Sequence, residues 1–381
     1  MNPPLLKNSR PWVAVILIFC GCIGHAASTV SLHDDGTSVR IPLTVFGKET
    51  HFMVDTAADI TLVDLRFEKM LGPPTATNSL MTLSATRDIL TYRGPNLTIG
   101  KETFACGLVA HLDLTTLRMI AGEHFDGVLG MNVMMTNVIV FDPDAATFSI
   151  GGKVPTQLKR HATRLPLVRD QSNGFKVKVQ ANGKPLELTL DTGSNFFLNL
   201  NLTDWDRVFA GRNEPIHENA MVGGDGIVIN TKYARIGEVR IGTNIFRNVI
   251  VGQTPNRKGR STLGFDFVRR HITAMDFPNR SVYLVPGKQF SAPQPMDLSG
   301  LRLIKTDAGV VVHSLRTNSP AAAAGFRPGD TINVINGIDA STLRLKTIRE
   351  MLRTKAGELI EIKLRRNNEA RELSFHLKEI F

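Results

Sequence analysis

The sequence predicts a mainly β protein with two similar lobes, followed by a smaller α+β domain. Three observations support this fold class. Alternating apolar runs, typical of paired strands, lead twice into an aspartate, at Asp55 and at Asp191. Landmark segments then recur in the same order after each aspartate. Beyond a proline-rich segment at 291–295 the pattern changes to mixed helices and strands. A chain of 381 residues is long enough for two or three such domains.

The N-terminus has the layout of a secretory signal peptide. Lys7 and Arg10 precede an apolar stretch from Trp12 to Ile23, and small residues follow, with a cleavage point after Ala26. The apolar stretch is about half of the roughly 20 residues that a spanning helix needs, so no stable membrane span is expected. We therefore expect an exported protein, located in the periplasm or cell envelope of a bacterium.

The cysteines agree with export to such a compartment. Cys20 and Cys22 leave a lipoprotein open as an alternative, although the usual aliphatic residue three positions before Cys22 is absent. Removal of residues 1–26 leaves only Cys106, so the exported chain has no internal disulfide. Cys106 follows apolar residues in a strand-like run and is expected to be buried.

The charge pattern and the motifs exclude several function classes. The net charge is +10, but the basic residues are scattered and no basic helix or basic–aromatic alternation is present, so no nucleic-acid partner is expected. The chain has no His-Glu-x-x-His spacing, no Gly-x-Ser-x-Gly segment, no phosphate-binding loop and no cysteine pair in its exported part. Neither a metal nor a cofactor is predicted.

Each of the two aspartates ends the second strand of a predicted hairpin. Before Asp55 an alternating run at 39–45 is followed by a turn at 47–49 and a returning run at 51–54. Before Asp191 the corresponding segments are a run at 175–179, a turn at 182–184 and a run at 186–190, as the sequence shows. Each carboxylate is therefore expected at the tip of a strand–turn–strand unit.

The repeat continues downstream of both aspartates. Gly130 lies 75 residues after Asp55, and Gly264 lies 73 residues after Asp191, each at the end of a short apolar run. This spacing indicates a duplicated unit of about 130 residues, which is too long for a solenoid repeat. The predicted divisions are a signal peptide at 1–26, a first lobe at 27–155, a second lobe at 156–288, a linker at 289–297 and a C-terminal domain at 298–381.

The C-terminal domain is predicted to alternate strands and helices. A strand at 309–315 is followed by a short helix with a cap and proline at 318–320 that ends at Gly325. A strand at 331–335 leads to a hairpin turn at 336–337. A second helix is predicted from Ser341 to about Arg353, and two strands around 367–368 complete the domain.

The aspartate motifs resemble those of the retropepsin-like and pepsin-like aspartic peptidases. The segment Asp-Thr-Gly-Ser at 191–194 matches the family motif fully, and Asp-Thr-Ala-Ala at 55–58 resembles it with Ala57 in place of glycine. The resemblance covers about residues 30 to 288 and implies two homologous β-barrel lobes with a cleft between them. It implies that Asp55 and Asp191 are the catalytic residues, and that Thr56, Thr192 and Gly193 support this dyad.

The chemistry of this family needs two carboxylates that share one proton. Two acids within hydrogen-bonding reach cannot both ionise at low cost, so one pKa rises. The ionised acid can then take a proton from water while the protonated acid polarises the peptide carbonyl. In this family the threonines, here Thr56 and Thr192, bond across the dyad. The sequence thus predicts an aspartic endopeptidase.

Ala57 leaves an alternative function open. The family's glycine allows close approach of the two turns and offers its amide to a carboxylate. The methyl group of Ala57 is either accommodated or separates the carboxylates, and a positive φ at this residue would cost about 1 kcal/mol. The alternative is a catalytically inactive adaptor that keeps the peptidase fold and binds peptides.

Peptidases of this type cover the substrate with a hairpin flap. Gly223, Gly224 and Gly226, between the second aspartate and Gly242, are the candidate flap tip, because glycines at a hairpin tip permit motion. The counterpart in the first lobe, around residues 84–92, is less clearly marked. A surface turn without substrate contact is the other interpretation of both segments.

The C-terminal domain resembles a PDZ domain. The resemblance rests on the segment 318–332, Asn-Ser-Pro-Ala-Ala-Ala-Ala-Gly-Phe-Arg-Pro-Gly-Asp-Thr-Ile, and on Asn-Gly at 336–337. It implies a groove between a strand and the second helix that binds an extended peptide by strand addition. Gly300, Leu301 and Arg302 are the candidate loop for a terminal carboxylate, so the partners would be polypeptide substrates or protein C-termini. Use of the domain only for packing, self-association or scaffolding stays open.

Overall fold

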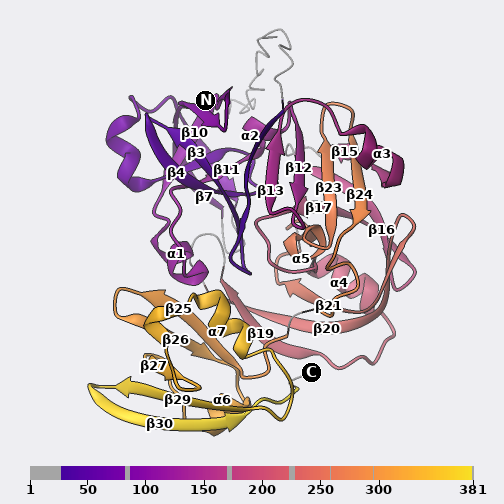
Figure 1. Ribbon diagram of the computed structural model, residues 1–381. Helices are drawn as coiled ribbons and strands as arrows, with labels where there is room; N and C mark the ends of the chain where they lie inside the picture. The colour runs from indigo at the N-terminus through magenta and orange to yellow at the C-terminus, as the bar shows by residue number, and fades with distance from the viewer. Residues whose placement is uncertain are drawn as a thin grey trace, which may run out of the picture.

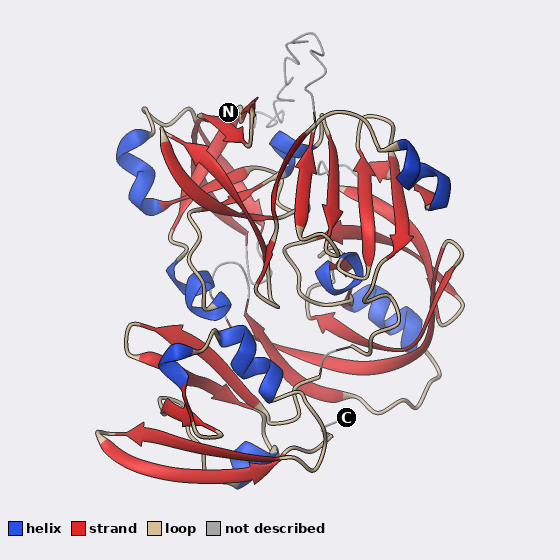
Figure 2. Ribbon diagram, viewed as in Figure 1, coloured by secondary structure: helices blue, strands red, loops and turns tan. Residues whose placement is uncertain are grey.

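The computed structural model describes residues 27–81, 86–169, 174–222, 228–257, 259–294 and 296–379. Two β-rich lobes lie side by side and a smaller domain lies beneath them (Figure 1). Strands dominate every part of the chain (Figure 2), so the predicted mainly β fold class is confirmed. The predicted signal peptide at 1–26 lies outside the described residues. Within the described ranges, no helix is long and apolar enough to span a membrane.

The first lobe consists mostly of short strands. In chain order its elements are β1 (Ser28–Ser31), β2 (His33–Asp34), β3 (Val39–Val45), β4 (Lys48–Val54), β5 (Thr61–Asp64), the 3₁₀ helix η1 (Leu65–Met70), β6 (Ala76–Met81), β7 (Thr86–Arg93), β8 (Asn96–Ile99), β9 (Glu102–Ala105), β10 (Leu108–Leu112), α1 (Thr115–Ala121), β11 (Gly127–Leu129), α2 (Met131–Met134), β12 (Val138–Asp142) and β13 (Thr147–Ile150).

The second lobe repeats this pattern with longer hairpins. Its elements are α3 (Thr156–His161), β14 (Thr163–Pro166), β15 (Val168–Arg169), β16 (Phe175–Ala181), β17 (Lys184–Asp191), β18 (Leu198–Asn201), α4 (Leu202–Phe209), β19 (His217–Val222), β20 (Val228–Ile241), β21 (Asn244–Thr254), β22 (Thr262–Gly264), α5 (Phe265–Val268), β23 (His271–Asp276) and β24 (Ser281–Pro286).

Strand pairing confirms the predicted duplication. In the first lobe β11 runs parallel to β4 and antiparallel to β5, and in the second lobe β22 pairs in the same way with β17 and β18. The landmark glycines lie at the ends of these central strands: Gly130 directly follows β11, and Gly264 is the last residue of β22. A Cβ atom at Gly130 would lie 2.5 Å from the carbonyl oxygen of Ile60, and one at Gly264 would lie 2.1 Å from that of Phe196. Glycine is therefore needed at both positions, because the chain passes directly against the loop that follows each aspartate.

A shared sheet joins the two lobes. Its strand order is β1-β13-β12-β23-β24-β14, and β12 of the first lobe pairs antiparallel with β23 of the second. One hydrophobic core continues through both lobes and contains fully buried aromatic side chains from each, such as Phe141 and Phe265. The lobes are thus held in a fixed relation, which positions the two aspartate turns against each other.

The C-terminal domain has a sheet and a core of its own. Its elements are β25 (Leu301–Thr306), β26 (Gly309–Leu315), α6 (Pro320–Ala323), β27 (Thr331–Ile335), β28 (Ile338–Asp339), the 3₁₀ helix η2 (Ala340–Thr342), α7 (Leu345–Met351), β29 (Leu359–Arg366) and β30 (Glu369–His376). The strands predicted at 309–315 and 331–335 are confirmed. The predicted start of the second helix at Ser341 is wrong, because Asp339 caps a separate 3₁₀ turn and α7 begins at Leu345.

Candidate active site

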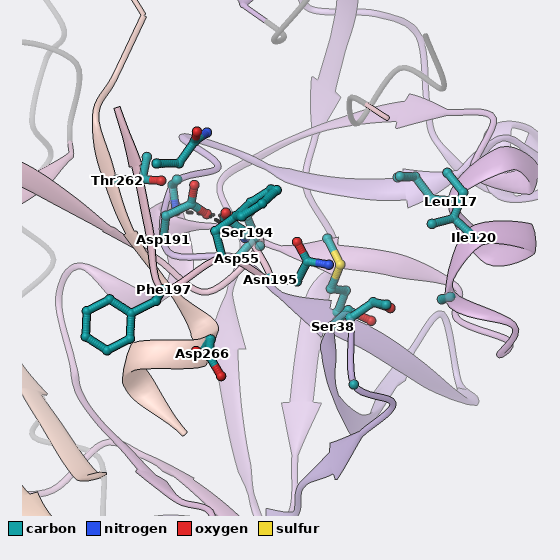
Figure 3. A pocket seen from close by; sticks show the side chains of 18 of the residues that line it. Ser38, Asp55, Leu117, Ile120, Asp191, Ser194, Asn195, Phe197, Thr262 and Asp266 are labelled. Atoms are coloured by element: carbon teal, nitrogen blue, oxygen red, sulfur yellow. Dashed lines mark hydrogen bonds between the residues drawn. The ribbon is translucent and has the colours of Figure 1, made fainter. Parts of the chain in front are cut away.

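The two predicted aspartates meet where the lobes face each other. Asp55 directly follows β4, and Asp191 is the last residue of β17. Figure 3 shows the two side chains next to each other at the wall of a cavity. A Cβ atom at Gly193 would lie 2.4 Å from Oδ2 of Asp55, so the carboxyl group of Asp55 packs directly on the turn that carries Asp191. The fold therefore brings the two carboxyl groups together.

Two threonines bond the turns to each other across the lobe interface. The Thr56 hydroxyl donates to the carbonyl oxygen of Leu190, and the Thr192 hydroxyl donates to that of Val54, both at 2.7 Å. Each hydroxyl oxygen also accepts the backbone N–H of the other threonine at 3.1 Å. Both threonines are buried, so these four hydrogen bonds are shielded from water. The structure places both residues as the resemblance implies.

Backbone amides hold the carboxylates in place. Oδ1 of Asp55 accepts the N–H of Ala57 at 2.8 Å and that of Ala58 at 3.1 Å. Oδ1 of Asp191 accepts the N–H of Ser194 at 3.0 Å. Hydrogen bonds of this kind fix the carboxyl planes and favour the ionised form.

Burial acts against ionisation and is the stronger effect. It raises the pKa of Asp191 to about 7, with the negative charge of Asp55 as the second cause, while the amides of Ser194 and Gly193 and the charge of Arg260 lower it. Burial likewise raises the pKa of Asp55 against its two amide hydrogen bonds. The pair therefore retains one proton well above the pH at which an isolated aspartate ionises.

Ala57 fits its position without strain. The residue is not among those with a positive φ, so the cost of about 1 kcal/mol considered for this residue does not arise. Its N–H makes the bond to Asp55 that the family's glycine would make. The equivalent position in the second lobe, Gly193, has no room for a methyl group. The two turns are thus not equivalent in the space that they leave for a side chain.

Arg260 is a site residue that sequence reasoning missed. From the loop before β22, its Nη1 donates to the carbonyl oxygen of Ala57 at 2.6 Å, and its Nη2 donates to Oδ1 of Asp59 at 3.0 Å. The second lobe thereby holds the first aspartate turn in place. The half-exposed side chain of Asp59 anchors this arginine. No sequence pattern links positions 57 and 260, and the only signal was an unexplained acid beside the first motif.

A cavity of about 640 Å³ extends from the aspartates to the C-terminal domain. Leu117 and Ile120 of α1 lie across it from the aspartates, as Figure 3 shows. Its far end is lined by arginines of the C-terminal domain, namely Arg302, Arg316, Arg349 and Arg353. The site is therefore formed by three parts of the chain, the two lobes and the C-terminal domain, whereas a site between the two lobes alone was predicted.

The predicted flap tip, Gly223, Gly224 and Gly226, lies outside the described residues. The arms that lead to it are described, because β19 and β20 pair antiparallel from His217–Tyr233 to Val222–Val228. The first lobe has an equivalent hairpin of β6 and β7. Hairpins are thus present at both expected places, and their contact with substrate stays a prediction.

The loop predicted to bind a terminal carboxylate is already occupied by a carboxylate of the same chain. Asp297 accepts the N–H of Ser299 at 3.1 Å and that of Gly300 at 2.8 Å. The N–H of Leu301 is bonded to the hydroxyl of Ser299 at 3.0 Å, and Arg302 lies in the β25–β26 pairing. The amides of Gly300 and Leu301 are therefore not free for a peptide end. Asp297 was missed because it is the last residue of the predicted linker, 289–297, just before the predicted start of the C-terminal domain.

Other candidate centres are few. Within the residues that the structure describes, no group of three or more His, Cys, Asp or Glu side chains is placed to hold a metal ion. Cys106 is buried as expected, and burial raises the pKa of its thiol. This cysteine is therefore poorly suited to act as a nucleophile.

Comparisons with known proteins identify two parts of the chain. Residues 41–133 match the family model of the aspartyl proteases, and residues 298–377 match that of the PDZ domain. A search of curated proteins finds no match. Among solved structures, an aspartic proteinase from Irpex lacteus matches with 14% sequence identity and a TM-score of 0.45, over 70% of this chain and 99% of that one.

Proposed function

The chain combines an aspartyl-protease-like segment with a PDZ domain, and on this premise we propose that it is an aspartic endopeptidase that hydrolyses polypeptides. The observation that carries the proposal is the pairing of Asp55 with Asp191 in a cavity, with threonine hydrogen bonds joining the two turns. A pKa near 7 for Asp191 supplies the shared proton that this chemistry needs.

In the proposed mechanism the dyad activates a water molecule. The ionised carboxylate takes one proton from water, and the water oxygen attacks the carbonyl carbon of the peptide bond. The protonated carboxyl group gives its proton to the carbonyl oxygen, which forms a neutral tetrahedral diol. Its collapse breaks the C–N bond: the nitrogen takes a proton from the dyad, one hydroxyl of the diol returns a proton to the dyad, and an acid and an amine leave, so the pair again holds one proton. No covalent bond to the protein is formed.

The surrounding groups position the dyad and do not react. Thr56 and Thr192 keep the two turns at a fixed separation, and Arg260 fixes the turn of the first lobe. Because the turns are held before substrate arrives, little reorganisation is needed at the reacting centre.

The cavity also supports a substrate class. Its far end carries Arg302, Arg316 and Arg353, and the partly buried Asp297 lies beside them. Within the described residues, the guanidinium of Arg353 makes no hydrogen bond and no ion pair within 4 Å; burial lowers its pKa, and the negative charge of Asp297 acts in the opposite direction. A carboxylate on the substrate would pair with this guanidinium in a poorly solvated site. We infer a preference for polypeptides with an acidic residue on one side of the cleaved bond.

The N-terminal sequence supports export to the periplasm or cell envelope of a bacterium as part of the proposal. In such a compartment, partly unfolded polypeptides would be the substrates. Neither a metal nor a cofactor enters the proposed chemistry.

The decisive assay compares three purified proteins on an unfolded polypeptide between pH 3 and pH 8. The natural chain should cleave, and Asp55→Asn and Asp191→Asn should lose at least about 1000-fold in kcat/KM, because neither can share the proton. Equal cleavage by all three proteins would refute the proposal. The adaptor alternative predicts no cleavage by any of them.

A further inference from the structure

The first lobe packs against the peptide groove of the PDZ domain and covers part of it. This groove lies between the edge strand β25 and helix α7. Helix α1 of the first lobe packs against β25, and Figure 1 shows α1 directly above β25 and α7. Nη2 of Arg349 on α7 joins the two sides, because it donates to the carbonyl oxygens of Leu303 at 2.9 Å and of Ile120 at 2.5 Å.

The end of α1 is shaped for this contact. Gly122 ends the helix in the left-handed conformation, with φ of 72°. A Cβ atom there would lie 2.5 Å from Cβ of Leu345, the first residue of α7, so only glycine allows the approach. The next residue, Glu123, accepts a hydrogen bond from Nε of Arg344 at 2.7 Å. The start of α7 is thus held against the first lobe by the close approach of Gly122 to Leu345 and by the ion pair of Glu123 with Arg344.

A second segment of the first lobe extends the contact. Nζ of Lys346 on α7 donates to the carbonyl oxygen of Asp34 at 3.1 Å, and its side chain packs next to Gly36. Beyond α1 the groove opens into the cavity, whose wall includes Leu301, Leu352 and Arg353. The docked groove therefore forms part of the wall that encloses the two aspartates.

An extended chain would satisfy this groove better than a helix does. Among the described strands, β25 pairs only with β26, so its other edge has no strand partner. In the described part of the chain, α1 is joined to the main chain of this edge by hydrogen bonds through the Arg349 side chain, which links Ile120 to Leu303. An added strand would bond the edge directly, since strand addition pairs main-chain groups along its whole length.

We propose that the PDZ groove and the α1 segment, residues 115–123, form a latch. In the closed state the groove holds α1 of its own chain, and an unfolded polypeptide that adds a strand to β25 displaces α1 and widens the cleft. The proposal rests on the proposed function, to which it adds regulation by substrate. Because closed and open states compete, the apparent affinity of any groove ligand is its intrinsic affinity reduced by the open fraction. By the same linkage, a ligand in the groove favours the open cleft.

The first test measures binding and needs no activity. It uses the full chain with Asp55→Asn and a fluorescein-labelled synthetic peptide of residues 113–124, followed by fluorescence anisotropy. Glu123→Arg sets two positive charges against each other at the latch and should bind this probe about fivefold tighter. The matched control is Glu372→Arg, which makes the same charge change in the exposed Lys363 pair on β29 and β30 and should leave binding unchanged.

Glu123 also forms an ion pair with Arg40, so Glu123→Arg could misfold for a reason unrelated to the latch. A second pair of variants therefore tests the latch without changing Glu123. Arg344→Glu breaks the same pair from the exposed side, and Lys363→Glu is its control. Hydrogen exchange of residues 115–121 should accelerate in Arg344→Glu and not in Lys363→Glu. Near-UV circular dichroism of each protein checks that its packing is intact.

The remaining arm measures cleavage of an unfolded polypeptide with Asp55 restored. Glu123→Arg should raise kcat/KM a few-fold over Glu372→Arg, because the cleft opens more often. If each latch variant matches its control in probe binding and in exchange, the latch is refuted, whatever the cleavage rates. If the binding difference holds but no variant cleaves, the proposed function fails and the latch stands.

Discussion

The unequal space at Ala57 and Gly193 leads to a paired prediction. A Cβ atom at Gly193 would lie 2.4 Å from Oδ2 of Asp55, whereas ordinary contacts begin at 3.4 Å. In Gly193→Ala the carboxyl group of Asp55 must therefore move by about 1 Å, and a displacement of that size at a reacting group costs about 100-fold in rate. That loss corresponds to about 3 kcal/mol of transition-state stabilisation.

The reverse change, Ala57→Gly, should have little effect. Ala57 has no positive φ, and its amide bond to Asp55 involves only the backbone. The added freedom of the unfolded chain costs about 0.5 to 1 kcal/mol of stability. We expect kcat/KM to stay within about threefold of the natural chain, a change of less than 1 kcal/mol in the barrier.

The assay measures kcat/KM of both variants on one fluorogenic polypeptide at pH 5, together with urea denaturation. Overpacking should also lower the stability of Gly193→Ala by about 1 to 3 kcal/mol, and the assay temperature must be chosen so that it stays folded. Full activity of folded Gly193→Ala would refute the reasoning about space. A large gain of activity in Ala57→Gly would favour the adaptor alternative.

Three further predictions concern the groups around the dyad. Burial raises the folded-state pKa of Asp191 from 3.8 to about 7, so ionisation of this acid destabilises the fold as pH rises through that window. The free energy of unfolding of Asp191→Asn should therefore exceed that of the natural chain by up to about 4 kcal/mol at pH 8 and by almost nothing near pH 3.5. Urea denaturation at the two pH values measures this difference. Arg260→Gln removes a positive charge that lowers the pKa of both aspartates, so the alkaline limb of the kcat/KM profile should move to higher pH. The lost hydrogen bond to Ala57 should also cost about 2 kcal/mol of stability. An alkaline limb at the same pH as in the natural chain would contradict this role. Thr192→Val leaves the carbonyl oxygen of Val54 and the N–H of Thr56 without their partner and should cost about 3 kcal/mol of stability. Thr192→Ser keeps the hydroxyl and should retain most of the stability. Equal stability of the two variants would count against the threonine hydrogen bonds between the turns.

The strands and turns that carry the two aspartates were predicted well, because each of them is determined by residues that are close together in the sequence. The alternating runs before Asp55 and Asp191 became β4 and β17, since a strand with one buried face needs a two-residue period. The landmark glycines at 130 and 264 were recognised from spacing, and their packing against the aspartate loops explains why the spacing recurs. The same local logic misplaced the start of α7, because Asp339 caps a short turn that resembles a helix start.

Contacts between distant segments were not predictable in this way. Arg260 reaches Ala57 across 203 positions, and Arg344 reaches Glu123 across 221. No periodicity or spacing relates such pairs, because they depend on how the lobes and the PDZ domain are arranged in space. The place of the PDZ domain in the cavity wall was missed for the same reason.

Both halves of the cleft lie on one chain and share the sheet in which β12 pairs with β23. In an assembly of two identical subunits every substitution appears twice, so an alanine tolerated in one turn would also be forced into the other. Fusion removes that constraint and allows each half to diverge separately. Ala57 beside an intact Gly193 is an asymmetry that an assembly of identical subunits could not carry, so each half can be engineered on its own.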